Sequence, residues 1–321
     1  MSEQTLPRLP STDHLAAFVE ELGPCEEPVR ITHFAEGHHN QIFLCGGPAN
    51  LPAQFILRYP KCPTAIDCLE ITYQRGTQAL EGLPTPQVLR FGRLACGTPV
   101  LLEEYVNGTP KNFAELSTAE IGALSETVST IHQRQSSCFS NKSGEAPICS
   151  GTYADYLWAM VQESVTDRLR TVDMTNYAAA QPLFAQGIQK LSRLIAQESE
   201  AFSGTIFSSL HHDLNQQNVL WPSDGSARVV DWNLTHGDPA DDLDYIFTDN
   251  HTSSSFRQAF LAAYKAPPGS GDVAARISAY THKNHLDDLA WTIMMCEQQG
   301  EQYRPAYQQR IAALTALLET T

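Results

Sequence analysis

Apolar and polar residues alternate with a period of two over several short stretches in the first third of the chain. Such alternation is typical of β-strands with one buried face. Turn residues in CGGPAN at 45–50 separate two of these stretches, so the pattern predicts a small antiparallel sheet. The five predicted strands occupy residues 29–34, 41–45, 54–59, 84–92 and 98–108.

Helical spacing of apolar residues dominates the rest of the chain. Ser117 and Glu120 form a capping-box pair at the start of one such stretch. The segment 136–152 lacks periodicity and predicts an irregular surface loop. This order predicts an α+β protein with two lobes, a sheet lobe over 1–105 and a larger helical lobe over 106–321. The predicted helices occupy residues 12–22, 65–82, 117–133, 153–171, 178–200, 254–265, 272–297 and 302–319.

Composition narrows the class of protein. The 321 residues are 42% hydrophobic, which is enough for a large core. No run of eighteen apolar residues is present, and the N-terminus lacks the basic then apolar order of a secretory signal, so we expect a cytoplasmic protein. Asp and Glu outnumber Lys and Arg by 36 to 21, which favours neither nucleic acid nor an acidic membrane as a partner. The oligomeric state stays open.

The eight cysteines are scattered, without a CxxC pair or a repeated spacing. This distribution indicates neither a zinc site nor a disulfide framework and favours reduced structural thiols. The histidine pairs His38-His39 and His211-His212 also lack the i, i+4 spacing that directs two helical ligands to one zinc ion.

The residues best suited to catalysis lie in LHHDLNQQNVLW at 210–221, where polar residues are flanked by apolar residues that form a frame on both sides. Leu210 and Leu214 predict buried anchors on one side, and the apolar run 219–221 on the other. Asp213 and Asn218 are five positions apart, so one loop can present both side chains to one cavity. The frame indicates that these polar groups are positioned rather than merely solvated.

A second acid follows in RVVDWN, where an apolar strand delivers Asp231 at its end. An asparagine oxygen and a carboxylate form a hard-oxygen site that suits Mg²⁺. Asn218 and Asp231 therefore predict the metal site, and Asp213 is left as the acceptor for a substrate proton. This division of roles matches the general template of kinase phosphoryl transfer.

The ordered motifs resemble those of the aminoglycoside phosphotransferase and choline kinase family of protein-kinase-like small-molecule kinases. The resemblance rests on H-x-D-x-x-x-x-N at 211–218, on Asp231-Trp232, and on HGDPADDLDY at 236–245. EGHHNQIF at 36–43 is similar to the family's phosphate loop, and LLEEYVNG at 101–108 to its nucleotide hinge. The resemblance implies a bilobal protein-kinase-like fold and a phosphotransferase that uses ATP and Mg²⁺.

For the catalytic loop, the resemblance implies that Asp213 orients or deprotonates the acceptor hydroxyl. His211 is expected to be a buried orienting histidine that bonds the backbone near Asp231, rather than a ligand or a base. Asn218 and Asp231 would hold Mg²⁺. In HGDPADDLDY, Asp238 and Asp242 are expected to have structural roles, as a loop-stabilising acid and a helix cap.

For the nucleotide, the resemblance implies that Arg58 contacts the α and β phosphates and that Glu70 pairs with it. The main chain of Glu103 and Tyr105 would bond the adenine edge, and the side chains of Glu103 and Glu104 are expected to form a solvated strand edge. The phosphate loop would comprise Gly37, His38, His39 and Asn40.

The chain departs from the family pattern mainly at His212, where glycine is usual between the motif His and Asp. A side chain there would touch the substrate or alter the loop. Arg58 stands where many relatives have lysine, a familiar replacement in this family.

Three function classes follow: an ATP-dependent small-molecule kinase, a catalytically idle nucleotide-binding relative, and a protein kinase. The last lacks D-F-G after the catalytic loop and A-P-E beyond it. Asp287, Asp288 and Trp291 place acid and aromatic groups on one helix and predict a cationic acceptor, such as an amino alcohol or an aminoglycoside. The plain alternative is a solvated helix and a neutral sugar-like acceptor.

Overall fold

The computed structural model forms two compact units, which are described separately. The first unit comprises Met1–Lys111 and Gln217–Leu234, and the second comprises Asn112–Gln216 and Thr235–Thr321. The sequence had placed the division near 105 and all later residues in one lobe. The structure describes residues 11–22, 29–36, 40–46, 54–61, 69, 81–140, 147–232, 235–249 and 252–319.

The first unit contains the predicted five-stranded antiparallel sheet, in the order β1-β2-β3-β5-β4. Helix α1 (Thr12–Glu20) begins after the cap residue Ser11 and packs Leu15, Phe18 and Val19 into a core with Phe55 of the sheet. The predicted helix at 65–82 lies almost wholly outside the described residues. The strands are β1 (Arg30–Glu36), β2 (Asn40–Gly46), β3 (Phe55–Pro60), β4 (Val88–Arg93) and β5 (Pro99–Glu104).

A second sheet of the first unit recruits a segment from far along the chain. Strand β9 (Val219–Pro222) pairs with both β6 (Gly108–Pro110) and β10 (Arg228–Val229), antiparallel in each case. The main chain of Val229 also donates to the carbonyl of Pro84, at 3.0 Å. These pairings hold the segment that follows residues 211–218, the predicted catalytic loop. Strands of two to four residues are too short to show periodicity, which explains why the sequence pattern missed most of this sheet.

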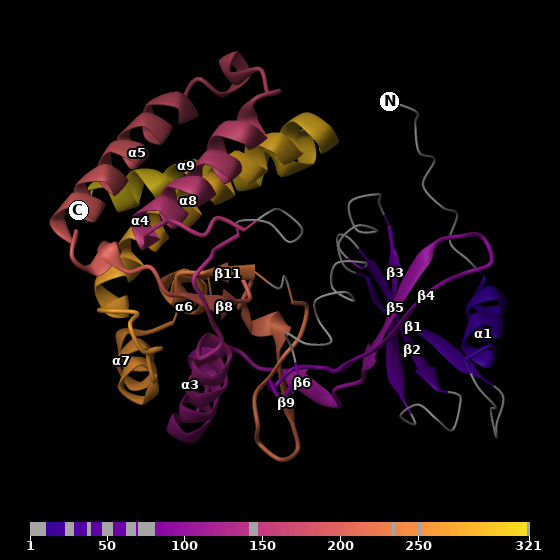
Figure 1. Ribbon diagram of the computed structural model, residues 1–321. Coiled ribbons are helices and arrows are strands. Elements are labelled where there is room, and N and C mark those ends of the chain that lie inside the picture. Colours follow the sequence, from indigo (N-terminus) through magenta and orange to yellow (C-terminus); the bar gives the residue numbers. More distant parts are fainter. Residues whose placement is uncertain are drawn as a thin grey trace. The chain divides into compact units, whose positions relative to one another are not determined.

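The second unit is mainly helical, as predicted. Its longest helix, α8 (Val273–Gln299), packs against α5 (Ala180–Gln197), α6 (Pro239–Asp244) and α9 (Arg304–Glu319) (Figure 1). The predicted capping box of Ser117 and Glu120 opens α3. Further helical elements of this unit include α3 (Thr118–His132), α4 (Tyr153–Val161), α7 (Ser254–Ala263), and π-helical turns at Gln162–Asp167 and Tyr245–Asp249.

A small sheet in the second unit carries the start of the catalytic loop. Strand β8 (Phe207–Leu210) lies between β7 (Gln135–Ser136) and β11 (Thr235–Gly237), and both neighbours are antiparallel to it. Phe207, Ser208 and Leu210 are fully buried. The strand is therefore fixed from both edges just before the motif residues. Within the described residues, no helix has the length and apolar character needed to cross a membrane.

The segment 136–152 corrects the prediction on cysteines. Cys138 and Cys149 form a disulfide, whereas the sequence favoured reduced thiols. The main chains of Phe139 and Ile148 pair as an antiparallel bridge beside it, which brings the two cysteines together. This local pairing cannot be read from cysteine spacing alone. The remaining part of the segment includes residues outside those described.

Gly108 and Gly122 offer a matched test of the packing of β6 against β9. A Cβ at Gly108 would lie 2.9 Å from the carbonyl carbon of Trp221 in β9, whereas a Cβ at Gly122 in α3 would meet nothing within 4 Å. We expect Gly108→Ala to lower the free energy of unfolding by about 1–3 kcal/mol, because backbone atoms must move. Gly122→Ala should raise it by about 0.5–1 kcal/mol, because alanine is the better helix former. Urea denaturation measures both, and equal effects would contradict the packing of β6 on β9.

Candidate active site

The catalytic loop leaves β8 between two buried leucines. Leu210 and Leu214 are both fully buried, as the apolar frame predicted, and they bracket His211, His212 and Asp213. His211 is buried completely, whereas the other two are partly exposed. Burial of the flanks fixes the loop at both ends and leaves the acid at its tip in contact with solvent.

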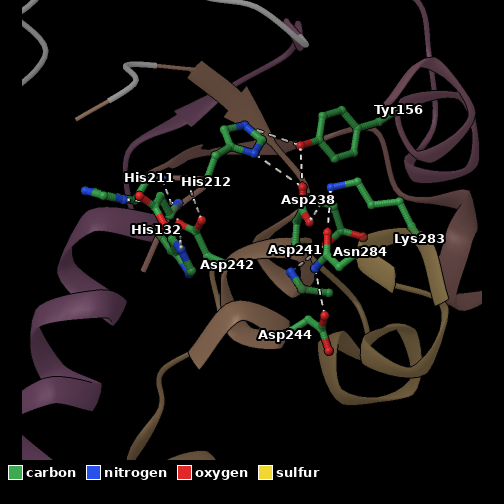
Figure 2. Close-up of polar contacts among 12 residues, drawn as sticks. His132, Tyr156, His211, His212, Asp238, Asp241, Asp242, Asp244, Lys283 and Asn284 are labelled. Atoms are coloured by element: carbon green, nitrogen blue, oxygen red, sulfur yellow. Dashed lines mark hydrogen bonds and ion pairs between the residues drawn. The ribbon is translucent and has the colours of Figure 1, made fainter. Parts of the chain in front are cut away.

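Asp242 of α6 fixes the backbone of this loop through hydrogen bonds. Its carboxylate accepts the main-chain N–H of His211 at 2.8 Å and of His212 at 2.7 Å (Figure 2). The Nε2 of His132 on α3 lies 3.2 Å from the same carboxylate. Burial opposes ionisation of Asp242, but the hydrogen bond from His132 keeps the pKa of its carboxyl below the ordinary value. A charged acceptor therefore receives two successive loop amides.

Asp213 is oriented by its near neighbours in the chain. Its main-chain N–H donates to Nδ1 of His211 at 3.2 Å, and Nδ2 of Asn215 donates to its carboxylate Oδ1 at 2.6 Å. The His211 ring therefore accepts a hydrogen bond from the backbone of Asp213, two residues further along the chain. The arrangement leaves the acid with a defined direction at a partly exposed position.

His212 has a left-handed backbone, with φ of 63°. This conformation explains why glycine is usual at this position, since a Cβ makes it costly. The Nδ1 of His212 lies 3.4 Å from Oδ2 of Asp241, and its Nε2 lies 3.5 Å from the hydroxyl of Tyr156. Sequence reasoning singled out His212 but gave it no partner.

Four aspartates of the Gly-Asp-Pro segment are fully buried: Asp238, Asp241, Asp242 and Asp244. Asp238 caps α6 by accepting the N–H of Ala240 at 3.0 Å, and Asp242 holds the loop amides, so the two predicted structural roles are exchanged. Asp238 also receives two hydrogen bonds from Arg276, at 2.6 and 2.8 Å. Burial raises the pKa of the Asp244 carboxyl.

Sequence reasoning missed the partners that α8 supplies to these acids. Arg276 pairs with Asp238, and Lys283 pairs with Asp241 at 3.2 Å. Asn284 donates to Asp244 at 2.7 Å. Arg276 and Lys283 are seven positions apart and therefore share one helix face. Two cations at that spacing, among the apolar residues of a long helix, indicate that the helix contacts buried acids from another part of the chain. This pattern was the sequence signal that could have predicted the pairs.

In the first unit, Arg58 of β3 forms two ion pairs. Its Nε lies 2.6 Å from Oε2 of Glu103, and its Nη1 lies 2.7 Å from Oδ1 of Asp231. The solvated strand edge expected for Glu103 is therefore wrong. Arg58 is opposite Leu101 in the ladder, so Glu103, two residues further, lies on the same face. Burial opposes the charge of Arg58, but the two carboxylates raise its pKa.

The predicted metal ligands are linked through the backbone. The N–H of Val230 donates to the carbonyl of Asn218 at 2.9 Å, which brings the strand end that carries Asp231 beside Asn218. Asp231 also has a left-handed backbone, with φ of 66°. An amide oxygen and a carboxylate at neighbouring positions are the hard donors that Mg²⁺ prefers, so these residues fit the ion.

The remaining nucleotide residues are only partly described. Gly37, His38, His39 and Glu70 lie outside the described residues. Asn40 begins β2 opposite Pro60. The ring of Tyr105 makes an edge contact with the exposed Phe34 of β1, with 5.9 Å between ring centroids.

Both aspartates of the predicted acceptor site have arginine partners from this chain. Asp287 pairs with Arg168, and Asp288 pairs with Arg310 of α9 at 2.8 Å. Trp291 makes an edge contact with Tyr303. The arginines neutralise much of the attraction that the two acids would exert on a cation. Burial raises the pKa of Asp288 to about 6.

Asp242 gives a direct test of how the loop is held. Asp242→Ala should lower the free energy of unfolding by about 2–4 kcal/mol, because two loop amides and His132 lose their acceptor. Asp242→Asn retains one carbonyl oxygen and should lose less. Asp13, exposed on α1, provides the control, and Asp13→Ala should stay within about 0.5 kcal/mol in the same urea titration. An Asp242→Ala variant as stable as this control would contradict the arrangement.

Asp288 predicts a pH dependence of stability. In the folded protein the carboxyl of Asp288 keeps its proton up to a pH of about 6, whereas in the unfolded chain its pKa is the ordinary 3.8. Between these values the folded state binds more protons, so this group makes wild-type stability fall as pH rises. Asp288→Asn lacks this titration, and its stability relative to wild type should increase from pH 4 to pH 7. Parallel unfolding curves over that range would refute the raised pKa.

Comparisons with solved structures show the fold. Choline kinase LicA from Streptococcus pneumoniae is 14% identical, with a TM-score of 0.62 over 96% of this chain and 99% of that one. Aminoglycoside phosphotransferase APH(4)-Ia is 18% identical, with a TM-score of 0.65 over 96% and 99%. A choline/ethanolamine kinase family protein from Mesorhizobium loti is 19% identical, with a TM-score of 0.61 over 96% and 95%.

These likenesses confirm the predicted α+β, protein-kinase-like fold class. A search of curated proteins finds no match to the sequence. The model of the phosphotransferase enzyme family, in contrast, matches residues 30–276, which include the sheet of the first unit, the catalytic loop and the Gly-Asp-Pro segment. The chain therefore belongs to the phosphotransferase enzyme family.

Proposed function

We propose that this protein transfers the γ-phosphate of ATP, with Mg²⁺, to a hydroxyl group of a small molecule. The observation that carries the proposal is the oriented acid of the catalytic loop. Asp213 stands on a loop anchored by buried flanks, with its carboxylate bonded by Asn215 and its amide bonded by His211. An idle nucleotide-binding relative would have no need of such an acid.

Solved relatives support the choice of reactants. A thermostable mutant of APH(4)-Ia has been crystallised as a ternary complex with ADP and hygromycin B, and LicA in complex with AMP. The former pairs an adenine nucleotide with a small molecule in one protein of this fold. Together with membership of the phosphotransferase family, this favours a small-molecule acceptor over a protein substrate.

Asp213 would accept the proton of the acceptor hydroxyl or align that hydroxyl with the phosphorus. Kinase catalysis of this kind depends on positioning and on charge stabilisation, since little covalent chemistry falls to the protein. The hydrogen bond from Asn215 fixes one carboxylate oxygen and thereby directs the other. The buried leucines on either side anchor the loop that carries this acid.

Asn218 and Asp231 would hold Mg²⁺, which when bound neutralises the charge of the transferring phosphoryl group. Arg58 would contact the α and β phosphates with its guanidinium, which is always charged at physiological pH. Asn40 and the main chain of Glu103 and Tyr105 are proposed to complete the nucleotide site.

The charge of the acceptor is best decided by a screen. Asp287 and Asp288 were predicted to attract a cation, but their pairing with Arg168 and Arg310 reduces that attraction. Amino alcohols, aminoglycosides and neutral sugars should therefore be compared side by side for ADP release. Absence of ADP release with every acceptor would favour the idle relative instead.

Two substitutions separate the proposed roles of the acids. Asp213→Asn should reduce turnover at least about 100-fold and leave ATP affinity unchanged, because it removes the proton acceptor and spares the metal ligands. Asp231→Ala should lower turnover and also raise the Mg²⁺ concentration needed for ATP binding. ADP release and nucleotide titration at several Mg²⁺ concentrations measure these effects.

The exposed Asp224 in the turn between β9 and β10 provides the control for both variants, and Asp224→Asn should behave as wild type. Full turnover in Asp213→Asn would remove this acid from the mechanism. An unaltered Mg²⁺ requirement in Asp231→Ala would remove Asp231 from the metal site.

A further inference from the structure

His212 occupies a backbone conformation that disfavours any side chain. Its φ of 63° places it in the left-handed region, which costs a non-glycine residue on the order of 1 kcal/mol or more. Such a residue persists only where its surroundings fix it. Three contacts do so here: the backbone N–H donates to Asp242, and the two ring nitrogens approach Asp241 and Tyr156.

Asp241 is a rigid partner for the ring. It is fully buried, its Oδ2 accepts the hydroxyl of Tyr156 at 2.9 Å, and its Oδ1 lies 3.2 Å from Nζ of Lys283. Lys283 in turn donates to Asn284 at 2.8 Å. Burial opposes ionisation, but Lys283 and His212 keep the pKa of Asp241 below its usual range. The anion beside the ring is thus fixed by α4 and α8 together.

Asp241 and Asp242 are consecutive on α6 and act on the same loop residue in two ways. Asp242 accepts the backbone N–H of His212, and Asp241 faces its ring (Figure 2). One short helix therefore fixes both the backbone and the side chain of the residue before Asp213. Rotation at this residue would reorient the acid that follows it.

The direction of the ring separates two roles for His212. Only 10% of the side chain is exposed, and both ring nitrogens face groups of the second unit. A residue that bound the acceptor would present its nitrogens to solvent. We propose that His212 is a positioning residue, whose ring docks on Asp241 and Tyr156 and thereby fixes the direction of Asp213. This inference rests on the phosphoryl transfer proposed above.

Kinetic constants test the docking against a role in substrate binding. His212→Ala keeps the left-handed cost and loses the dock, so kcat should fall about 10-fold or more while KM for ATP and for the acceptor stays within about twofold. His212→Asn tolerates the left-handed backbone and offers a polar group to Asp241, and should recover part of kcat. A KM for the acceptor that rises in both variants, with kcat retained, would overturn the proposal.

Hydrogen–deuterium exchange supplies a readout that needs no activity. The loop amides of His211 and His212 are bonded to Asp242, so exchange over 207–216 should be slow in wild type and faster in His212→Ala. Tyr156→Phe, which removes only the hydroxyl bonded to Asp241, should accelerate exchange to a smaller extent. His14→Ala, at an exposed histidine of α1, is the control.

The two measurements distinguish failure of the inference from failure of the proposed function. Wild-type protein that transfers no phosphate to any acceptor contradicts the proposed function, and the exchange comparison still decides whether the ring holds the loop. Active wild-type protein with unchanged kcat and unchanged loop exchange in His212→Ala overturns the positioning role.

Discussion

The candidate site of the second unit depends on one carboxylate that binds two successive backbone amides. Asp242 accepts the N–H groups of His211 and His212, and this fixes the chain where β8 ends and the motif begins. Hydrogen bonds from amides to an ionised acceptor are short and strong, and they are costly to lose when the donors are shielded from water. His132 on α3 binds the same group and ties it to a third element. The direction of Asp213 follows from this arrangement.

A buried carboxylate needs compensation, and α8 provides most of it for α6. Arg276 forms a bidentate pair with Asp238, and Lys283 pairs with Asp241. Replacing one partner of such a pair leaves a buried charge, so each residue constrains the other. The long helix, for which the sequence predicted an acceptor site at Asp287, Asp288 and Trp291, thus stabilises the short helix that holds the loop. The stability of the second unit and the geometry of its site share the same contacts.

The sequence predicted what depends on local order and missed what depends on partners distant in the chain. The apolar frame around Asp213 and the five-stranded sheet follow from periodicity over neighbouring residues, and both are present. Local order predicts a solvated edge for Glu103, because its contact with Arg58, 45 positions away in the chain, depends on the pairing of β3 with β5. The ion pair between Lys283 and Asp241 was not predicted from the sequence for the same reason. The disulfide between Cys138 and Cys149 depends on the β-bridge between Phe139 and Ile148, which lies in a segment without a periodic pattern.

The two non-glycine residues with positive φ among those described are His212 and Asp231, and each belongs to a motif. In each case the side chain faces an oppositely charged or polar group of its own unit, Asp241 for the histidine and Arg58 for the aspartate. Strained backbone persists only where side-chain contacts over-determine it, and such positions gather at functional sites. Glycine would relieve the strain at either position but would remove the contact. The cost of the left-handed conformation is therefore offset at both positions by an interaction that fixes the direction of a functional group.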